Sequence, residues 1–319
     1  MHKYDWQLAG HETQRVQLEQ DMNTGNLAHA YLFYGPSEVG KCTLAKTFAN
    51  ILQCPNGLCG DCPVCVQIEK DCHYDTITMR DMGESLKIEQ VQKLVSQLST
   101  TSQSNYKIVI IEDIERMTLP AANALLKTLE EPGEDTIFFL TTNAITKVLD
   151  TIKSRVRLVK FAHVSNEALD QYLEARGLPV DEATKRQATT FAFGSIGKFF
   201  RLIKNHDDLR ETKDLYDMLV NLLEGGSVSA KFNFVKKISE DKKQAKKMLE
   251  MLTHIVRSML LAKTGYTTSL QDIPELLSDF SINDLLELIE KIESAKQDLE
   301  HNVNTKLLLE NLFLETVHV

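Results

Sequence analysis

The stretch GPSEVGKC, at residues 35–42, constrains the fold of this chain more than any other part of the sequence. It follows the phosphate-binding pattern G-x-x-x-x-G-K-[ST] at three positions, Gly35, Gly40 and Lys41. Such a loop lies between a strand and a helix, because backbone N–H groups of the loop and of the helix N-terminus bind the phosphate together. The apolar run AYLFY at 30–34 predicts the strand, and KCTLAKTFANILQ at 41–53 predicts the helix. The chain is therefore predicted to contain a P-loop α/β domain.

The last position of the loop departs from the pattern, because Cys42 stands where a Ser or Thr hydroxyl would bind Mg²⁺. Mg²⁺ prefers hard oxygen ligands, whereas the sulfur of a thiol is soft. Three interpretations follow from this replacement. The chain is a damaged motor, a motor that uses Thr43 instead, or no motor at all.

A P-loop motor also needs an acidic residue at the end of a neighbouring strand to hold Mg²⁺ and orient the attacking water. Asp113 follows the apolar run IVII and meets this need. The customary order is Asp then Glu, but Ile114 follows here, and Glu112 precedes Asp113 on the other side of the strand. Either the site has lost its water-activating carboxylate, which is the interpretation we favour, or Glu112 and Asp113 have exchanged roles.

Short β-rich runs alternate with helical patterns through the first half of the chain, which predicts a parallel sheet with crossover helices. Further strands are predicted at 75–79, 107–114, 136–143 and 157–161, with further helices at 87–99 and 121–131. Beyond about residue 164 helical patterns take over, beginning with a capped helix at 165–177. Near the end of the chain, one apolar helix face is predicted from Ile282, Leu285, Leu286, Ile289 and Ile292. The fold class is therefore α/β followed by all-α.

The four cysteines Cys54, Cys59, Cys62 and Cys65 form the most specific local signal in the chain. Their spacing, C-x4-C-x2-C-x2-C, suits a tetrahedral Zn²⁺ ion, and four thiolate ligands leave no open position for catalysis. Such crowding in a cytosolic chain favours a metal over disulfides. We therefore predict a structural zinc module. Cys72 and His73 lie just outside it and are interpreted as ordinary loop or packing residues.

Composition excludes two broad classes of protein. The formal net charge of −9 argues against a free-standing nucleic-acid binder, which usually carries a basic stripe. No apolar run approaches the roughly 20 residues that span a bilayer, and the first residues have no apolar signal segment. We therefore expect no membrane partner and a cytoplasmic location.

The motifs in this order resemble the clamp-loader branch of the AAA+ ATPases. The resemblance rests on HAYLFYGP, the four-cysteine insert straight after the P-loop helix, ANALLKTLEEP, FLTTN and the SR pair. It implies a RecA-like AAA+ domain at 1–163 with its zinc module at 54–65, a helical lid domain at 164–207, and a helical collar domain at 208–319. Through such a collar, subunits of this branch form a hetero-pentamer.

The resemblance also implies roles for single residues. Lys41 and its loop would bind phosphate, Asp113 would hold the metal, and Asn143 would sense the γ-phosphate. Arg155, in the SR pair, matches the arginine finger that one subunit presents to the ATP of its neighbour. Val156 replaces the cysteine that usually follows this pair, which leaves the arginine in place.

Three departures, at Cys42, Ile114 and Gly197, all fall on the subunit's own hydrolysis; at the last one, motor subunits carry a sensor arginine. None of the three falls on Arg155. The resemblance therefore implies a bacterial clamp-loader subunit that donates a finger but does not turn over ATP itself. Its partners would be the gamma/tau ATPase subunits, the delta subunit, the sliding clamp and, through the complex, primed DNA.

Other interpretations stay open. The runner-up is a catalytically active ATPase of the gamma/tau type, and binding of ATP with Mg²⁺ at the altered P-loop remains an open question. A zinc-containing interaction module unrelated to replication would explain the cysteines but not the P-loop. A free-standing kinase or NTPase is disfavoured by the same three departures.

Overall fold

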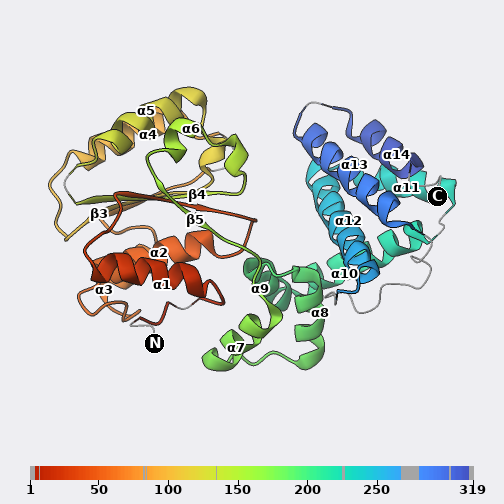
Figure 1. Ribbon diagram of the computed structural model, residues 1–319, viewed down its shortest axis with the longest axis horizontal. Coiled ribbons are helices and arrows are strands. Elements are labelled where there is room, and N and C mark those ends of the chain that lie inside the picture. Colours follow the sequence, from red (N-terminus) through yellow and green to blue (C-terminus); the bar gives the residue numbers. More distant parts are fainter. Residues whose placement is uncertain are drawn as a thin grey trace. The chain divides into compact units, whose positions relative to one another are not determined.

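The computed structural model describes residues 4–6, 8–81, 83, 85–133, 135–224, 227–266, 280–301 and 303–315. The chain divides into two compact units (Figure 1). Unit 1 comprises residues 1–179 with 194–198, and unit 2 comprises residues 180–193 with 199–319. The three domains expected from the sequence stay a prediction.

Unit 1 is built on a parallel sheet of five strands in the order β2-β3-β4-β1-β5. The strands are β1 (Ala30–Tyr34), β2 (Thr76–Met79), β3 (Lys107–Ile111), β4 (Thr136–Thr142) and β5 (Arg157–Lys160). The prediction of a parallel α/β fold is thereby confirmed. Because the carboxyl ends of parallel strands lie along one edge, the segments that follow β1, β3 and β4 meet there.

Helices cover both faces of this sheet (Figure 1). One face carries α1 (Glu12–Asn23), α2 (Lys41–Gln53) and α3 (Pro63–Glu69), and the other carries α4 (Ile88–Leu98), α5 (Leu119–Glu130) and α6 (Asp150–Lys153). Side chains of β1 alternate between the two cores, since successive residues of a strand point to opposite faces. Tyr31 and Phe33 pack in the core beneath α1 and α2, whereas Leu32 packs in the core beneath α4 and α5.

Helix α7 begins and ends as its sequence predicts, whereas α5 begins two residues before the predicted range 121–131 and ends one residue earlier. In α7 (Asn166–Arg176), the Ser165 hydroxyl accepts the N–H of Ala168, and Gly177 ends the helix with φ of 56°. In α5, the Thr118 hydroxyl accepts the N–H of Ala121. Short 3-10 turns, η1 (Ile114–Arg116) and η2 (Ile145–Lys147), follow β3 and β4.

Unit 2 is helical in the part of the chain that the structure describes. It holds α8 (Glu182–Ala192), α10 (His206–Leu223), α11 (Val228–Ile238), α12 (Lys242–Lys263), α13 (Ile282–Glu300) and α14 (Thr305–Glu315), and α9 (Ile196–Lys204) begins in unit 1 and ends in unit 2. Among the described residues, none of these helices has both the length and the apolar composition that crossing a membrane requires.

The apolar face predicted for α13 was wrong in part. Leu285 and Ile292 are buried, but Ile282 and Leu286 are 44% and 45% exposed. The buried stripe continues instead through Leu288, Ala295 and Leu299. Helix α13 packs against both α12 and α14, and its buried side lies about a fifth of a turn from the face that the sequence suggested.

Candidate functional site

The P-loop connects β1 to α2 and has the backbone of a phosphate-binding loop. Gly35 and Gly40 have φ of 149° and 103°, values that favour glycine. Two backbone carbonyls between these glycines accept hydrogen bonds from residues outside the loop. Ser37 O accepts the Ser195 hydroxyl at 3.2 Å, and Glu38 O accepts the Gly197 N–H at 2.8 Å. Such contacts fix the loop before any ligand arrives.

Gly197 matters for its size as well as for this hydrogen bond. A Cβ at this position would lie 3.1 Å from both the Cβ and the carbonyl oxygen of Glu38. The start of α9 therefore packs directly on the P-loop backbone, and a longer side chain at 197 would push the two segments apart.

Lys41 is 5% exposed and lies among oxygen atoms of its own chain. Its Nζ donates to Gly35 O at 2.9 Å, to Pro36 O, and to Asn143 Oδ1 at 2.8 Å. Asn143 Nδ2 in turn donates to Asp113 Oδ1 at 2.7 Å. The structure thus brings together the lysine, the acid and the polar residue that the sequence singled out. Burial lowers the pKa of Lys41 and raises the pKa of Asp113.

Cys42 occupies the first turn of α2 and faces the end of β4. Its Sγ lies 3.7 Å from the Thr141 Oγ1 atom, and burial raises the pKa of the thiol to about 11. At neutral pH this group is a thiol and not a thiolate. Thr43 lies about 100° further around the helix and is exposed to solvent.

Glu112 and Asp113 follow β3 and face different neighbours; Asp113 has a left-handed backbone, with φ of 51°. The nearest cation to Glu112 is Arg80, whose Nε lies 4.0 Å from the Glu112 Oε1 atom. Arg80 also pairs with Asp71, which pairs with Lys46 at 2.8 Å. Burial raises the pKa of Glu112 despite these cations. Glu112 is thus part of a charged cluster on one side of the strand, while Asp113 contacts Asn143.

Replacing Gly35 by alanine is expected to lower the free energy of unfolding by about 2–3 kcal/mol, because the added Cβ would lie 2.3 Å from the Phe161 carbonyl oxygen at an unfavourable φ. Urea unfolding checks this value. Gly25→Ala is the matched control: Gly25 also has a positive φ, of 68°, but no described heavy atom lies within 4 Å of the new Cβ. Its expected cost is about 1 kcal/mol, and equal losses in the two variants would contradict the steric argument.

Arg155 lies at the end of α6, on the surface of unit 1. Its Nη1 donates to Thr151 O at 2.9 Å and to Ser154 Oγ at 3.1 Å, and its Nη2 pairs with Glu130 Oε1 at 2.6 Å. The side chain is 35% exposed. No sequence pattern pointed to Glu130 as its partner.

The position of Arg155 separates it from the P-loop of its own chain. Residue Arg157, at the start of β5, pairs with Tyr31 of β1. Gly35 comes four residues after Tyr31, a distance of roughly 13 Å at about 3.3 Å per residue. Arg155 precedes β5 and therefore belongs to the edge of the sheet opposite the P-loop. A role for this arginine at its own nucleotide site is disfavoured by this placement.

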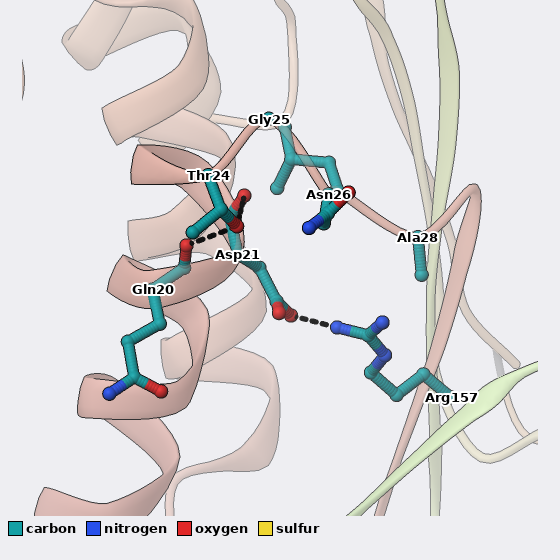
Figure 2. Close-up of a pocket in the computed structure, with 8 residues that line it drawn as sticks. Gln20, Asp21, Thr24, Gly25, Asn26, Ala28 and Arg157 are labelled. Carbon is teal, nitrogen blue, oxygen red and sulfur yellow. Dashed lines mark hydrogen bonds and ion pairs between the residues drawn. The ribbon is translucent and has the colours of Figure 1, made fainter.

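A pocket of about 800 Å³ lies at this same edge, between the end of α1, the loop before β1 and Arg157 (Figure 2). Figure 2 shows Asp21 pointing from α1 toward the Arg157 guanidinium, with which it forms an ion pair. The Tyr31 hydroxyl donates to the same carboxylate at 3.0 Å. Because its two charged groups neutralise each other, we interpret this hollow as a structural feature that fixes α1 to the sheet.

The four cysteines come together just after α2. All four Sγ atoms lie within 4.8 Å of one another, and three of the separations are 3.6, 3.8 and 4.0 Å. A tetrahedral Zn²⁺ ion with Zn–S bonds of about 2.3 Å would place its sulfur ligands about 3.8 Å apart. Cys62 also begins α3, since its Sγ accepts the Cys65 N–H. The cluster Cys54, Cys59, Cys62 and Cys65 can therefore hold a metal ion, and Cys72 and His73 lie outside it.

A P-loop after β1, an acid after β3 and an asparagine after β4, on adjacent strands of a parallel sheet, define a RecA-like domain of the AAA+ class. A family model described as "DNA polymerase III, delta subunit" matches residues 10–165, and one for the C-terminal part of that subunit matches residues 208–318. The delta-prime subunit of DNA polymerase III from Bacillus subtilis is 30% identical over 315 residues, which cover 93% of each chain. This chain belongs to the family of DNA polymerase III delta-prime subunits.

Relatives named as gamma subunits also match. The DNA polymerase III gamma subunit of Buchnera aphidicola is 28% identical over 251 residues, covering 75% of this chain and 68% of that protein. A crystal structure of a gamma subunit-related protein from Thermotoga maritima has a TM-score of 0.53 at 20% identity and covers 94% of this chain and 98% of that one. This likeness supports the fold alone. The resemblance to the clamp-loader branch that the motifs suggested is confirmed.

Proposed function

We propose that this chain is a clamp-loader subunit of bacterial DNA polymerase III that presents Arg155 to the ATP of a neighbouring subunit and does not hydrolyse ATP in its own P-loop. The neighbours are the gamma/tau ATPase subunits and the delta subunit of a hetero-pentamer in the cytoplasm. The assembled complex acts on the sliding clamp and primed DNA. Membership of the delta-prime family supports this role.

The proposal that this P-loop does not hydrolyse ATP rests on one observation, the Cys42 thiol beside Thr141. It stands where a phosphate-binding loop places a hydroxyl oxygen for Mg²⁺, and a neutral thiol is a poor ligand for that ion. Gly35, Gly40 and Lys41 match the phosphate-binding pattern, and the contact of Lys41 with Asn143 supports binding of a nucleotide here. We therefore propose that a nucleotide bound here is held without turnover.

Two features support the donation of Arg155. It belongs to the sheet edge opposite its own P-loop, and a third of its side chain is exposed. A positioned guanidinium in trans stabilises the charge that develops on the transferred phosphoryl group. The test is ATP hydrolysis by the assembled complex with the wild-type chain or its Arg155→Ala variant, for which a steep fall is expected.

We also propose that the four-cysteine cluster binds one structural Zn²⁺ ion. The sulfur separations fit a tetrahedral site, and four protein thiolates leave no coordination position for a substrate. The ion would fix the turns between α2 and α3 and would take no part in hydrolysis.

The isolated chain is expected to show no ATP turnover above background, and Lys41→Ala is expected to leave that background unchanged. Phosphate release under steady-state conditions with excess Mg²⁺ measures both. The alternative is an active ATPase of the gamma/tau type, and the similarity to the gamma subunit of Buchnera is consistent with it. A steady rate that Lys41→Ala abolishes would decide for that ATPase.

A further inference from the structure

We propose that Glu130 is a positioning residue for Arg155, holding the guanidinium in the orientation in which it meets the phosphate of the neighbouring subunit. This inference rests on the proposed function, because it assigns a second residue to the same finger. Glu130 belongs to α5 and Arg155 follows α6, and the two side chains form an ion pair of 2.6 Å.

The contacts of Arg155 restrain its guanidinium from two sides. Nη1 donates to Thr151 O and Ser154 Oγ, both of which belong to the same short segment as Arg155 itself. Nη2 pairs with Glu130, which comes from a separate helix. A planar group that is bound at two of its nitrogens from two elements has its plane fixed as well as its position. Local contacts from α6 alone would leave the plane free to rotate.

Stability does not explain this ion pair. Glu130 is 49% exposed and Arg155 is 35% exposed, and pairs in such settings contribute little to folding because water and salt screen them. An exposed arginine otherwise samples many rotamers. Binding of a ligand selects one of them, which costs side-chain conformational entropy. A carboxylate that holds one rotamer beforehand removes that cost at the moment of reaction.

The restraint leaves the finger able to work. Arginine carries five N–H donors, and the contacts with Thr151, Ser154 and Glu130 use three of them. The guanidinium also stays protonated in any protein environment, so its two remaining N–H groups can donate to a phosphate oxygen. Glu130 thus acts through Arg155 and needs no contact with nucleotide.

The chain offers a matched control in the next residue. Glu131 carries the same charge, is exposed, and ends α5 as its C-cap. If the rate depended only on negative charge near the end of α5, variants of Glu130 and Glu131 would lower it equally. If the rate depends on the positioning of Arg155, only the Glu130 variants would lower it.

The experiment measures ATP hydrolysis by the assembled complex with clamp and primed DNA, with this subunit as wild type, Glu130→Ala, Glu130→Gln, Glu131→Ala or Arg155→Ala. Glu130→Ala is expected to lower kcat about tenfold with the KM for ATP unchanged, since a misplaced catalytic group loses rate and not ground-state binding. Glu130→Gln, which keeps a neutral acceptor in place, is expected to recover part of the rate. Glu131→Ala is expected to behave as wild type. Size-exclusion chromatography confirms that each variant assembles.

A double variant decides whether Glu130 acts through the finger. In the Arg155→Ala background, Glu130→Ala is expected to cause no further loss, because the group that it positions is gone. The proposal is overturned if Glu130→Ala matches wild type, if Glu131→Ala falls as far, or if the two losses multiply in the double variant. A full rate with Arg155→Ala would instead remove the proposed function, and the role of Glu130 with it. A fall with Arg155→Ala but not with Glu130→Ala would remove the positioning role only.

Discussion

Removing the proposed Zn²⁺ ion from the cluster of Cys54, Cys59, Cys62 and Cys65 is expected to unfold the segment between α2 and α3. The segment has few core residues of its own, and residues 54–70 contact the core of unit 1 through the buried Ile68 and the partly buried Leu58 and Val64. Binding of zinc to four thiolates contributes on the order of 10 kcal/mol to the folding of such modules. The purified protein should carry one zinc per chain. A chelator should lower its Tm and raise hydrogen exchange at residues 54–70.

Single replacements sharpen this test. Cys54→Ser and Cys65→Ser, at the two buried ligands, are expected to reduce the zinc content and to reproduce the effect of the chelator. Cys72→Ser is the matched control, because Cys72 is exposed and lies outside the group of four. Acid should release the metal, since a cysteine binds it as the thiolate and protonation to the thiol removes that ligand. Metal analysis that finds no zinc, or a Cys54→Ser variant that keeps its zinc, would contradict the assignment.

The parts of the fold that the sequence predicted best are those whose burial leaves a simple pattern. The strand Ala30–Tyr34 and the helix Lys41–Gln53 have the bounds that the sequence suggested. The strand is apolar because helices cover it on both faces, and the P-loop glycines between the two elements mark where one ends and the other begins.

Elements without such a pattern were missed. Helix α1 buries Leu18, Glu19 and Asp21, so its inward side is not an apolar stripe. Glu19 is satisfied there because its carboxylate accepts the Trp6 indole N–H at 2.6 Å. Helix α6 has four residues, too few to show a period. Hydrophobic periodicity detects neither a helix anchored by buried acids nor a single turn.

The candidate site also has one part that the sequence predicted and one part that it did not. That Lys41, Asp113 and Asn143 meet follows from the topology, because each lies in a segment that follows the carboxyl end of a strand of one parallel sheet. The pairing of Arg155 with Glu130 does not follow from it. It depends on how the ends of α5 and α6 are placed, and no local pattern encodes that placement.

Replacing Arg155 by alanine is expected to slow ATP hydrolysis at the neighbouring subunit's site by about 10³-fold or more. A guanidinium that stabilises transition-state charge contributes mainly to the chemical step, so kcat should fall while binding of ATP to the complex changes little. Single-turnover hydrolysis by the assembled complex, with clamp and primed DNA, measures the chemical step directly. Arg155→Lys should recover little, because an ammonium is a point charge and lacks the planar fork of donors.

Arg157 provides the matched control for this variant. It lies two residues further along the chain, and its guanidinium pairs with Asp21 beside the Tyr31 ring, beneath α1 (Figure 2). Arg157→Ala therefore removes the same charge from a position two residues away, at the start of β5, and should cost some stability but leave hydrolysis near the wild-type rate. If Arg155→Ala left the rate unchanged, or if both variants slowed it equally, the finger would be contradicted. The chain would then contribute to the complex through its fold alone, and an intact Arg155 at the surface would need another explanation.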